Sequence, residues 1–158
     1  MPGTGVYLHI PFCRSRCSYC DFATDVYRSS GAVERYVAAL ISEIQNSRID
    51  IESAADTVYF GGGTPSLLLP QQVERIIEVV RDRFGISVDT EITMEMNPAT
   101  VTLESLTAYR SLGVNRASFG VQTFDDTALK LLARGHNADD ARNTFKLLRE
   151  AGFDNISL

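Results

Sequence analysis

Hydrophobic stretches with two different spacings alternate along the chain. Runs of β-prone apolar residues predict strands, and apolar residues that recur every three or four positions predict helices. The strands are expected at residues 6–10, 57–60, 91–96, 116–121 and 155–158, and the helices at residues 32–45, 70–84, 103–112, 125–134 and 138–151. Ser30 or Gly31 would cap the first helix, and Gly113 and Gly152 would end two others.

This alternation predicts an α/β fold with a parallel sheet. Four βα units are complete and a fifth strand begins at Asn155, so we expect residues 1–158 to form one domain, a partial (β/α) barrel. A last strand without a following helix lacks cover on one side. We therefore expect the native chain to continue beyond Leu158.

Composition and charge are those of a globular protein. The chain is 44% hydrophobic and 22% charged, which rules out disorder. Its net charge of −5 argues against non-specific binding of nucleic acid, which requires a basic surface. No apolar run approaches the roughly 18 residues that span a bilayer. Because the N-terminus also lacks the basic segment of a secretory signal, we expect a cytoplasmic protein.

The three cysteines lie together, immediately after the first predicted strand. Cys13, Cys17 and Cys20 form the pattern C-x3-C-x2-C. The carboxyl ends of parallel strands are where α/β proteins place their sites. Clustered cysteines in such a position indicate metal or redox chemistry. A four-iron cluster normally takes four cysteines, so three would leave one iron open to a small molecule.

Two other interpretations of the cysteines stay open from the residues alone. The three thiols could be incidental and buried, although clustering at the end of a strand argues against that. A structural zinc ion needs four ligands, and His9 in the first strand could supply the fourth.

The motifs around the cysteines resemble a known family. C-x3-C-x2-C after a first strand resembles the radical S-adenosylmethionine (SAM) superfamily. The flanking segments resemble its oxygen-independent coproporphyrinogen III oxidase family, and they cover nearly the whole chain in the right order. They are residues 7–13 (YLHIPFC), 17–22 (CSYCDF), 60–66 (FGGGTPS), 95–98 (EMNP), 119–124 (FGVQTF) and 134–136 (RGH).

The resemblance implies two cofactors. Cys13, Cys17 and Cys20 would hold a [4Fe-4S] cluster, and SAM would bind the open iron through its amino and carboxylate groups. An electron from the cluster would then cleave SAM to methionine and a 5′-deoxyadenosyl radical. Such a reaction implies an electron donor, for example flavodoxin or ferredoxin.

The resemblance also implies which residues contact SAM. Tyr7 and Tyr19 flank the cysteine segment and would contact SAM. Gly62, Gly63 and Thr64 would meet the amino group of SAM, and Glu95 would accept from a ribose hydroxyl. Gln122 ends the fourth predicted strand, and Arg134 would pair with the methionyl carboxylate. The alternatives are core packing for the tyrosines, a plain βα turn for the glycines, a solvent-facing carboxylate for Glu95 and a solvated helix end for Arg134.

One position next to the cysteines separates two branches of the family. True coproporphyrinogen oxidases carry a further cysteine two residues after the third ligand, where this chain has Phe22. Phenylalanine there resembles the HemW-like branch, the haem chaperones, which are proposed to bind haem and deliver it to acceptor proteins. The alternatives are an oxidase that decarboxylates coproporphyrinogen III in porphyrin biosynthesis and a radical enzyme with an unrelated substrate. We assign no catalytic residue.

The haem site itself is expected outside these residues. His136-Asn137 superficially resembles a haem-linked His-Asn-x-x-Tyr motif of one subfamily, but Asp140 stands where the tyrosine would be. A lone histidine near a helix end is more often structural, so His136 is not included among the site residues.

Overall fold

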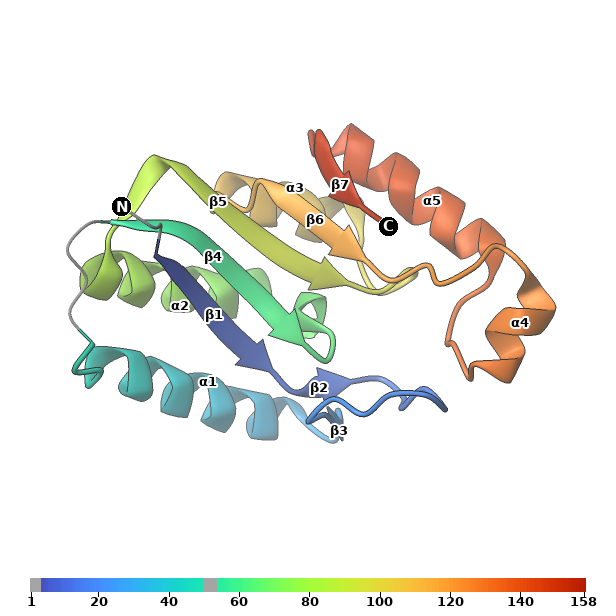
Figure 1. The fold of residues 1–158 in the computed structure, drawn as a ribbon, viewed down its shortest axis with the longest axis horizontal. Helices are drawn as coiled ribbons and strands as arrows, with labels where there is room; N and C mark the ends of the chain where they lie inside the picture. The colour runs from blue at the N-terminus through green and yellow to red at the C-terminus, as the bar shows by residue number, and fades with distance from the viewer. Residues whose placement is uncertain (1–3, 50–53) are drawn as a thin grey trace.

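Five parallel strands form the sheet that carries the rest of the fold (Figure 1). The computed structural model describes residues 4–49 and 54–158. Each strand is hydrogen-bonded to the next one along the chain, and every pair is parallel. The strands are β1 (Gly5–Ile10), β4 (Ala55–Gly62), β5 (Ile86–Met96), β6 (Arg116–Phe119) and β7 (Asn155–Ser157).

Helices connect the successive strands. They are α1 (Ser30–Gln45), α2 (Pro70–Phe84), α3 (Leu103–Ser111), α4 (Asp126–Leu131) and α5 (Ala138–Glu150), with a 3-10 turn η1 (Pro65–Leu67) after β4. Four βα units and a fifth strand are therefore present, and a strand order that follows chain order is typical of a barrel. The predicted partial (β/α) barrel is confirmed. Within the described ranges, no helix is long and apolar enough to cross a membrane.

The two faces of the sheet differ in polarity. Alternate residues of a strand point to opposite faces, and one set, for example Leu8, Phe60 and Met94, is buried in the core with residues of the helices. The other set is polar and partly exposed. It includes Tyr7, His9, Tyr59, Glu95, Arg116 and Ser118, and Thr93 lies buried among them. A parallel sheet with one polar face matches the wall of a barrel whose interior holds a site.

A second, very short pair of strands flanks the segment that contains the cysteines. β2 (Phe12–Cys13) pairs with β3 (Asp25–Val26). Residues 13–24, which we call the cysteine loop, begin at the last residue of β2 and end just before β3. The turn after β4 anchors this pair, because Thr64 N–H donates to Phe12 O at 2.7 Å. Strands of two residues have no periodicity, so the hydrophobic pattern could not predict them.

α1 begins at Ser30, two residues before the expected start, and its cap differs from the prediction. Ser29, and not Ser30 or Gly31, is the N-cap: its side chain accepts a hydrogen bond from Ala32 N–H at 3.2 Å. Its backbone is extended (φ −164°, ψ 153°), as a cap requires, whereas Ser30 and Gly31 are already helical. Gly113 and Gly152 have positive φ, as expected just past two other helices.

β6 and α4 both end earlier than the sequence pattern predicts. β6 ends at Phe119 and α4 ends at Leu131, against expected ends at residues 121 and 134. Gln122 and Ala133 have φ angles of 68° and 52°, in the left-handed region, which neither a strand nor a right-handed helix can include. Gln122 therefore lies after the fourth strand and not at its end.

Tyr109 of α3 ties the helical layer to the turn after β4. Its ring is buried, and its hydroxyl donates to Leu68 O at 2.6 Å and lies 3.3 Å from Ser66 O. Burial raises the pKa of Tyr109 from 10.0 to about 12. The neutral phenol is thus favoured by the folded state.

We expect Tyr109 to make the protein sensitive to alkaline pH. The pKa of Tyr109 is higher in the folded than in the unfolded protein. The free energy of unfolding is therefore largest below pH 10 and falls by about 3 kcal/mol as the pH rises to about 12. Tyr109→Phe should cost about 1–3 kcal/mol near neutral pH and should weaken the loss at high pH. Urea unfolding at several pH values measures both effects. Tyr27→Phe, at an exposed tyrosine, is the control and should change neither.

Candidate functional site

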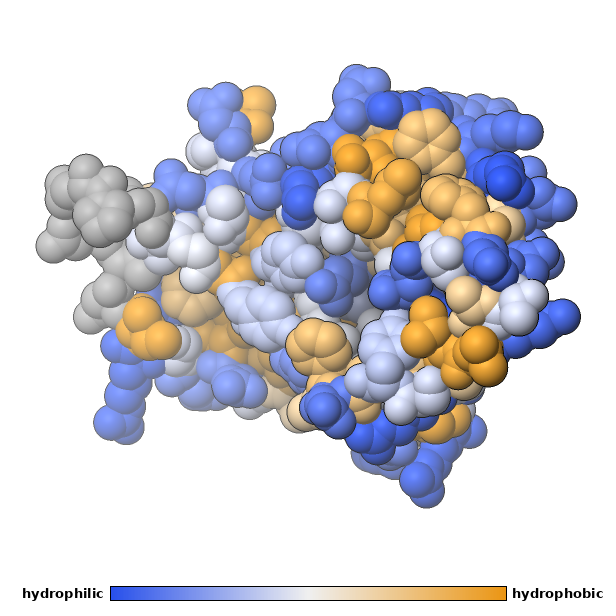
Figure 2. Space-filling view, turned by 45° about the vertical axis from the view of Figure 1, so that its right-hand side comes forward, coloured by the Kyte–Doolittle hydropathy of each residue, from blue (hydrophilic) through white to orange (hydrophobic). Residues whose placement is uncertain are grey.

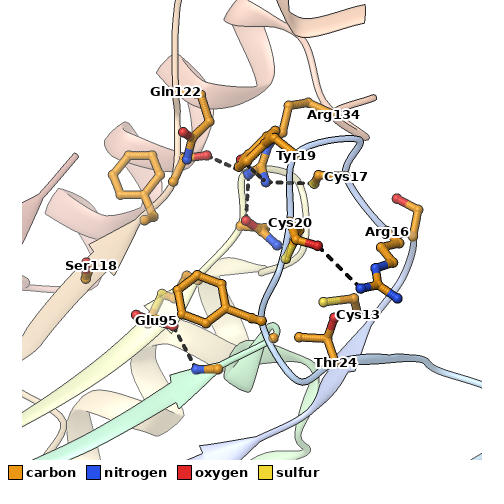
Figure 3. A pocket seen from close by; sticks show the side chains of 18 of the residues that line it. Cys13, Arg16, Cys17, Tyr19, Cys20, Thr24, Glu95, Ser118, Gln122 and Arg134 are labelled. Carbon is orange, nitrogen blue, oxygen red and sulfur yellow. Dashed lines mark hydrogen bonds between the residues drawn. The ribbon is translucent and has the colours of Figure 1, made fainter. Parts of the chain in front are cut away.

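A cavity of about 420 Å³ lies between the carboxyl ends of the strands and the cysteine loop (Figure 3). The cysteine loop, the glycine turn after β4, the ends of β5 and β6, and the segment after α4 all contribute to its wall. Of the predicted site residues, only Tyr7 and Thr64 are not part of the lining. Those that line it are Cys13, Cys17, Tyr19, Cys20, Gly62, Gly63, Glu95, Gln122 and Arg134.

The three cysteines are partly buried free thiols on this wall. A turn in which Cys20 N–H donates to Cys17 O (3.2 Å) sets the spacing of the second and third, and Ser18 N–H holds the loop to Leu132 O (3.2 Å) after α4. In the described part of the chain, no three Cys, His, Asp or Glu side chains lie close enough to hold one metal ion. A four-iron cluster makes no such demand, because each cysteine binds a different iron.

Cys13 is partly buried beside the turn after β4. Burial raises the pKa of its thiol, and Thr64, whose hydroxyl lies 3.8 Å from the sulfur, opposes that rise. Nearby Cys20 and Cys17 raise the pKa further. A cationic centre beside Cys13 would favour its thiolate, and an iron cluster supplies such a centre.

His9 does not complete the cysteine group. Its Nδ1 lies 3.1 Å from Tyr7 Oη and its Nε2 lies 2.8 Å from Ala23 O, so both ring nitrogens have partners away from the thiols. The geometry gives no support to a single zinc ion held by the cysteines and His9.

The glycine turn brings backbone against the cysteine loop. A Cβ on Gly63 would lie 2.6 Å from Phe12 O and 3.0 Å from Cys13 Sγ, so no side chain fits there. Gly62 has φ +114°, and a Cβ on it would lie 2.7 Å from the His9 ring. The turn thus requires glycine at both positions, which a plain βα turn does not.

Glu95 projects from the end of β5 into the cavity (Figure 3). Tyr59 Oη donates to its Oε1 at 2.8 Å, and Gly62 N–H donates to its Oε2 at 3.0 Å. One donor on each oxygen fixes the orientation of the carboxylate and leaves further lone pairs for a ligand. The solvent-facing alternative for Glu95 is therefore wrong.

Arg134 lies above the cysteine loop with its guanidinium surrounded by acceptors (Figure 3). Nη1 donates to Cys17 Sγ at 3.2 Å and lies 3.4 Å from Tyr19 Oη, while Nη2 donates to Asn97 Oδ1 at 2.7 Å and Gly120 O at 2.6 Å. Arg134 Nε is buried and has no hydrogen-bond partner among the described residues. A solvated helix-end arginine does not fit this position.

The remaining predicted residues are placed unequally. Gln122 lines the cavity from the loop after β6. Tyr19 is 47% exposed at its mouth, where a planar ring could cover a ligand. Tyr7 is 58% exposed and its ring stacks on Tyr59 with centroids 6.0 Å apart, outside the cavity lining. A contact of Tyr7 with SAM stays a prediction, as do the other assigned contacts.

Tyr59 and Asn97 hold site residues in place but were not assigned from the sequence. Tyr59, which holds Glu95, is one of several aromatic residues in a strand, and no local pattern distinguishes it. Asn97 bonds both Arg134 and Thr64, and its place in the segment Glu-Met-Asn-Pro was a signal that could have identified it.

His136 has a structural position. It is buried, and its Nε2 lies 3.3 Å from Val121 O. Burial lowers its pKa, and the charge of Arg134 lowers it further. The neutral ring therefore packs under the loop after β6, consistent with its omission from the site.

These residues fit an iron–sulfur cluster with an attached small molecule. Three thiols share one cavity wall, and two of them have hydrogen-bond donors at their sulfurs. Such donors are typical of cluster environments. Beside them lie an oriented carboxylate, an amide and a cation, which suit a zwitterionic nucleoside.

Comparison with known proteins agrees with this chemistry. The haem chaperone HemW of Lactococcus lactis is 38% identical over 152 residues, which cover 96% of this chain and 39% of that protein. HemW of Escherichia coli is 36% identical over 159 residues, covering 100% of this chain and 42% of that protein. The chain thus spans about two fifths of the length of these curated relatives.

A solved structure extends the comparison to the fold. The coproporphyrinogen III oxidase HemN of Escherichia coli, a radical SAM enzyme, matches with a TM-score of 0.87 and 31% identity, covering 98% of this chain and 36% of that one. The resemblance expected from the motifs is confirmed. The radical SAM superfamily model matches residues 7–158, nearly the whole chain, and the protein therefore belongs to the radical SAM superfamily.

Proposed function

We propose that this chain is the cluster- and SAM-binding part of a HemW-like haem chaperone that delivers haem to acceptor proteins. Cys13, Cys17 and Cys20 would hold the [4Fe-4S] cluster, and SAM would occupy the cavity beside them. When bound, these groups supply one-electron chemistry, with flavodoxin or ferredoxin as a suitable class of electron donor. The proposal places the protein in the cytoplasm.

The surrounding residues would bind and orient SAM. Glu95, held by Tyr59 and Gly62, offers free lone pairs to a ribose hydroxyl. Gln122 can both donate and accept from the opposite wall. The buried Nε–H of Arg134, without a partner among the described residues, supports an acceptor group beside it.

Phe22 is the observation that favours the HemW-like branch of the family over the oxidase branch. It lines the cavity together with the three cysteines and is 67% exposed. In the oxidase branch, this position would hold a further cysteine. A phenyl ring cannot bind metal or transfer a proton, so an apolar contact replaces a reactive thiol at the mouth of the site.

Apolar surface near the cavity supports a large apolar ligand or partner. Figure 2 shows several apolar patches on the right half of the face that it presents. Among the described residues, Phe22, Phe124, Leu131 and Leu158 are exposed apolar side chains, and Phe22 and Leu158 line the cavity. Exposed apolar patches commonly mark binding sites, and a haem macrocycle or an acceptor protein would cover such a surface.

Anaerobic assays of the full-length protein test this proposal. We expect the reconstituted protein to bind haem, seen as a Soret band that follows the protein through gel filtration, and to leave coproporphyrinogen III unchanged. Phe22→Cys should not create turnover, because one thiol does not supply a substrate site. Decarboxylation of coproporphyrinogen by the unsubstituted protein would instead establish the oxidase alternative.

A further inference from the structure

A chain of hydrogen bonds connects two of the cysteines through the body of the protein. Arg134 Nη1 donates to Cys17 Sγ (3.2 Å), and Nη2 of the same guanidinium donates to Asn97 Oδ1 (2.7 Å). Asn97 Nδ2 donates to Thr64 Oγ1 (2.7 Å), and Thr64 Oγ1 lies 3.8 Å from Cys13 Sγ. Asn97 is the central link.

Chemistry determines the direction of every hydrogen bond in this chain. A guanidinium only donates, so Asn97 must turn its oxygen toward Arg134 and its NH₂ group toward Thr64. The Thr64 oxygen then accepts from Asn97, and its own proton remains for Cys13 Sγ. Both ends of the chain therefore present a donor to a sulfur.

The members come from segments that are far apart in the sequence. Thr64 precedes η1, Asn97 follows β5, and Arg134 follows α4. Thr64 is 1% exposed, so water does not compete for its hydroxyl. The chain is consequently a built feature of the tertiary structure, since no local turn could bring these groups together.

We propose that Asn97 is a positioning residue that directs hydrogen bonds onto the sulfurs of Cys13 and Cys17. The inference rests on the proposed binding of a cluster by these cysteines. Donors to ligand sulfurs stabilise the more negative, reduced cluster and thereby raise its reduction potential. It also assigns the hydroxyl of Thr64 to Cys13, in place of the contact with SAM implied by the family resemblance.

Asn97→Asp removes one hydrogen bond of this series. The carboxylate still accepts from Arg134 but has no N–H for Thr64, so the Thr64 hydroxyl turns to donate to Asp and abandons Cys13. We expect the midpoint potential of the cluster to become more negative by about 59 mV, a tenfold change for a one-electron couple. Potentiometric titration of the reconstituted full-length protein, followed by EPR, measures it.

Thr64→Val distinguishes the effect of losing the hydrogen bond to Cys13 from the effect of the charge that Asn97→Asp adds. It removes the hydroxyl without introducing a carboxylate, and we expect a shift in the same direction. In the double variant, the effect of Asn97→Asp should be smaller than in the unsubstituted protein, because the hydroxyl that it redirects is already absent.

Asn115→Asp is the matched control. Asn115 is also a partly buried amide beside the sheet, where its Oδ1 accepts from Ile92 N–H and its Nδ2 donates to Thr90 O. It therefore loses one donor by the same substitution, away from the cavity. We expect lower stability against urea but an unchanged potential.

Each outcome decides the inference. Unchanged potentials in Asn97→Asp and Thr64→Val would overturn it. These two variants could instead stay folded and lose their iron. In that case, normal iron content in Asn115→Asp supports the inference, and an equal loss of iron in Asn115→Asp overturns it. An unsubstituted protein that binds no cluster would overturn the proposed function itself, and this inference with it.

Discussion

Cys17→Ser is expected to abolish cluster binding. A serine hydroxyl is a hard and weakly acidic ligand that replaces a soft thiolate, and only three cysteines are present. After anaerobic reconstitution with iron and sulfide, we expect the variant to lack the bound iron and the brown visible absorption of the unsubstituted protein.

Ser18→Ala is the control for this experiment. Ser18 lies in the same loop but does not line the cavity, and its hydroxyl donates to Leu131 O at 3.2 Å. It should retain the cluster, which would show that a change in the loop alone is tolerated. Normal iron content in Cys17→Ser would remove Cys17 from the ligand set.

Gly63→Ala is expected to damage both the fold and the site. The new Cβ would meet the backbone oxygen of Phe12 at 2.6 Å, and a backbone atom cannot move aside as the end of a side chain can. Separating the turn from β2 also displaces Cys13, whose sulfur would lie 3.0 Å from the Cβ. Overpacking of this kind costs about 1–3 kcal/mol, and we expect most of the cluster to be lost with it.

Gly31→Ala provides the comparison, measured by urea unfolding and by iron content. Gly31 lies in the first turn of α1, and the nearest atom to its Cβ would be the end of the Arg35 side chain at 3.7 Å. This variant should be as stable as the unsubstituted protein, or slightly more, because alanine favours helix. Equal stability of Gly63→Ala and Gly31→Ala would contradict the close packing of the turn against the cysteine loop.

The two substitutions together bear on how the cavity is built. Cys17 tests a side chain, whereas Gly63 tests the absence of one. If both variants lose the cluster but only Gly63→Ala loses stability, the thiols bind the cluster, whereas the glycine turn also stabilises the fold. The glycine turn would then be a part of the fold that is formed before any cofactor binds.

The sequence by itself determined the features that depend on local spacing. The repeats of apolar residues predicted the helices and most of the strands, since amphipathic periodicity reports which side of an element is buried. The three cysteines were identified because they lie within eight residues of one another. Short elements such as β2 and β3 escaped, as did the ends of β6 and α4, because two residues carry no period and a positive φ at Gln122 or Ala133 leaves no mark in the pattern.

Only the tertiary structure decided which distant residues meet. Tyr59 reaches Glu95 because β4 and β5 pair in one particular register, and Asn97 reaches both Thr64 and Arg134 because three connections end at the same edge of the sheet. Tyr7 lies on the same polar face yet outside the cavity, since its ring stacks on Tyr59. Such contacts depend on strand register and on the packing of separate connections, and neither is encoded in the neighbours of a residue along the chain.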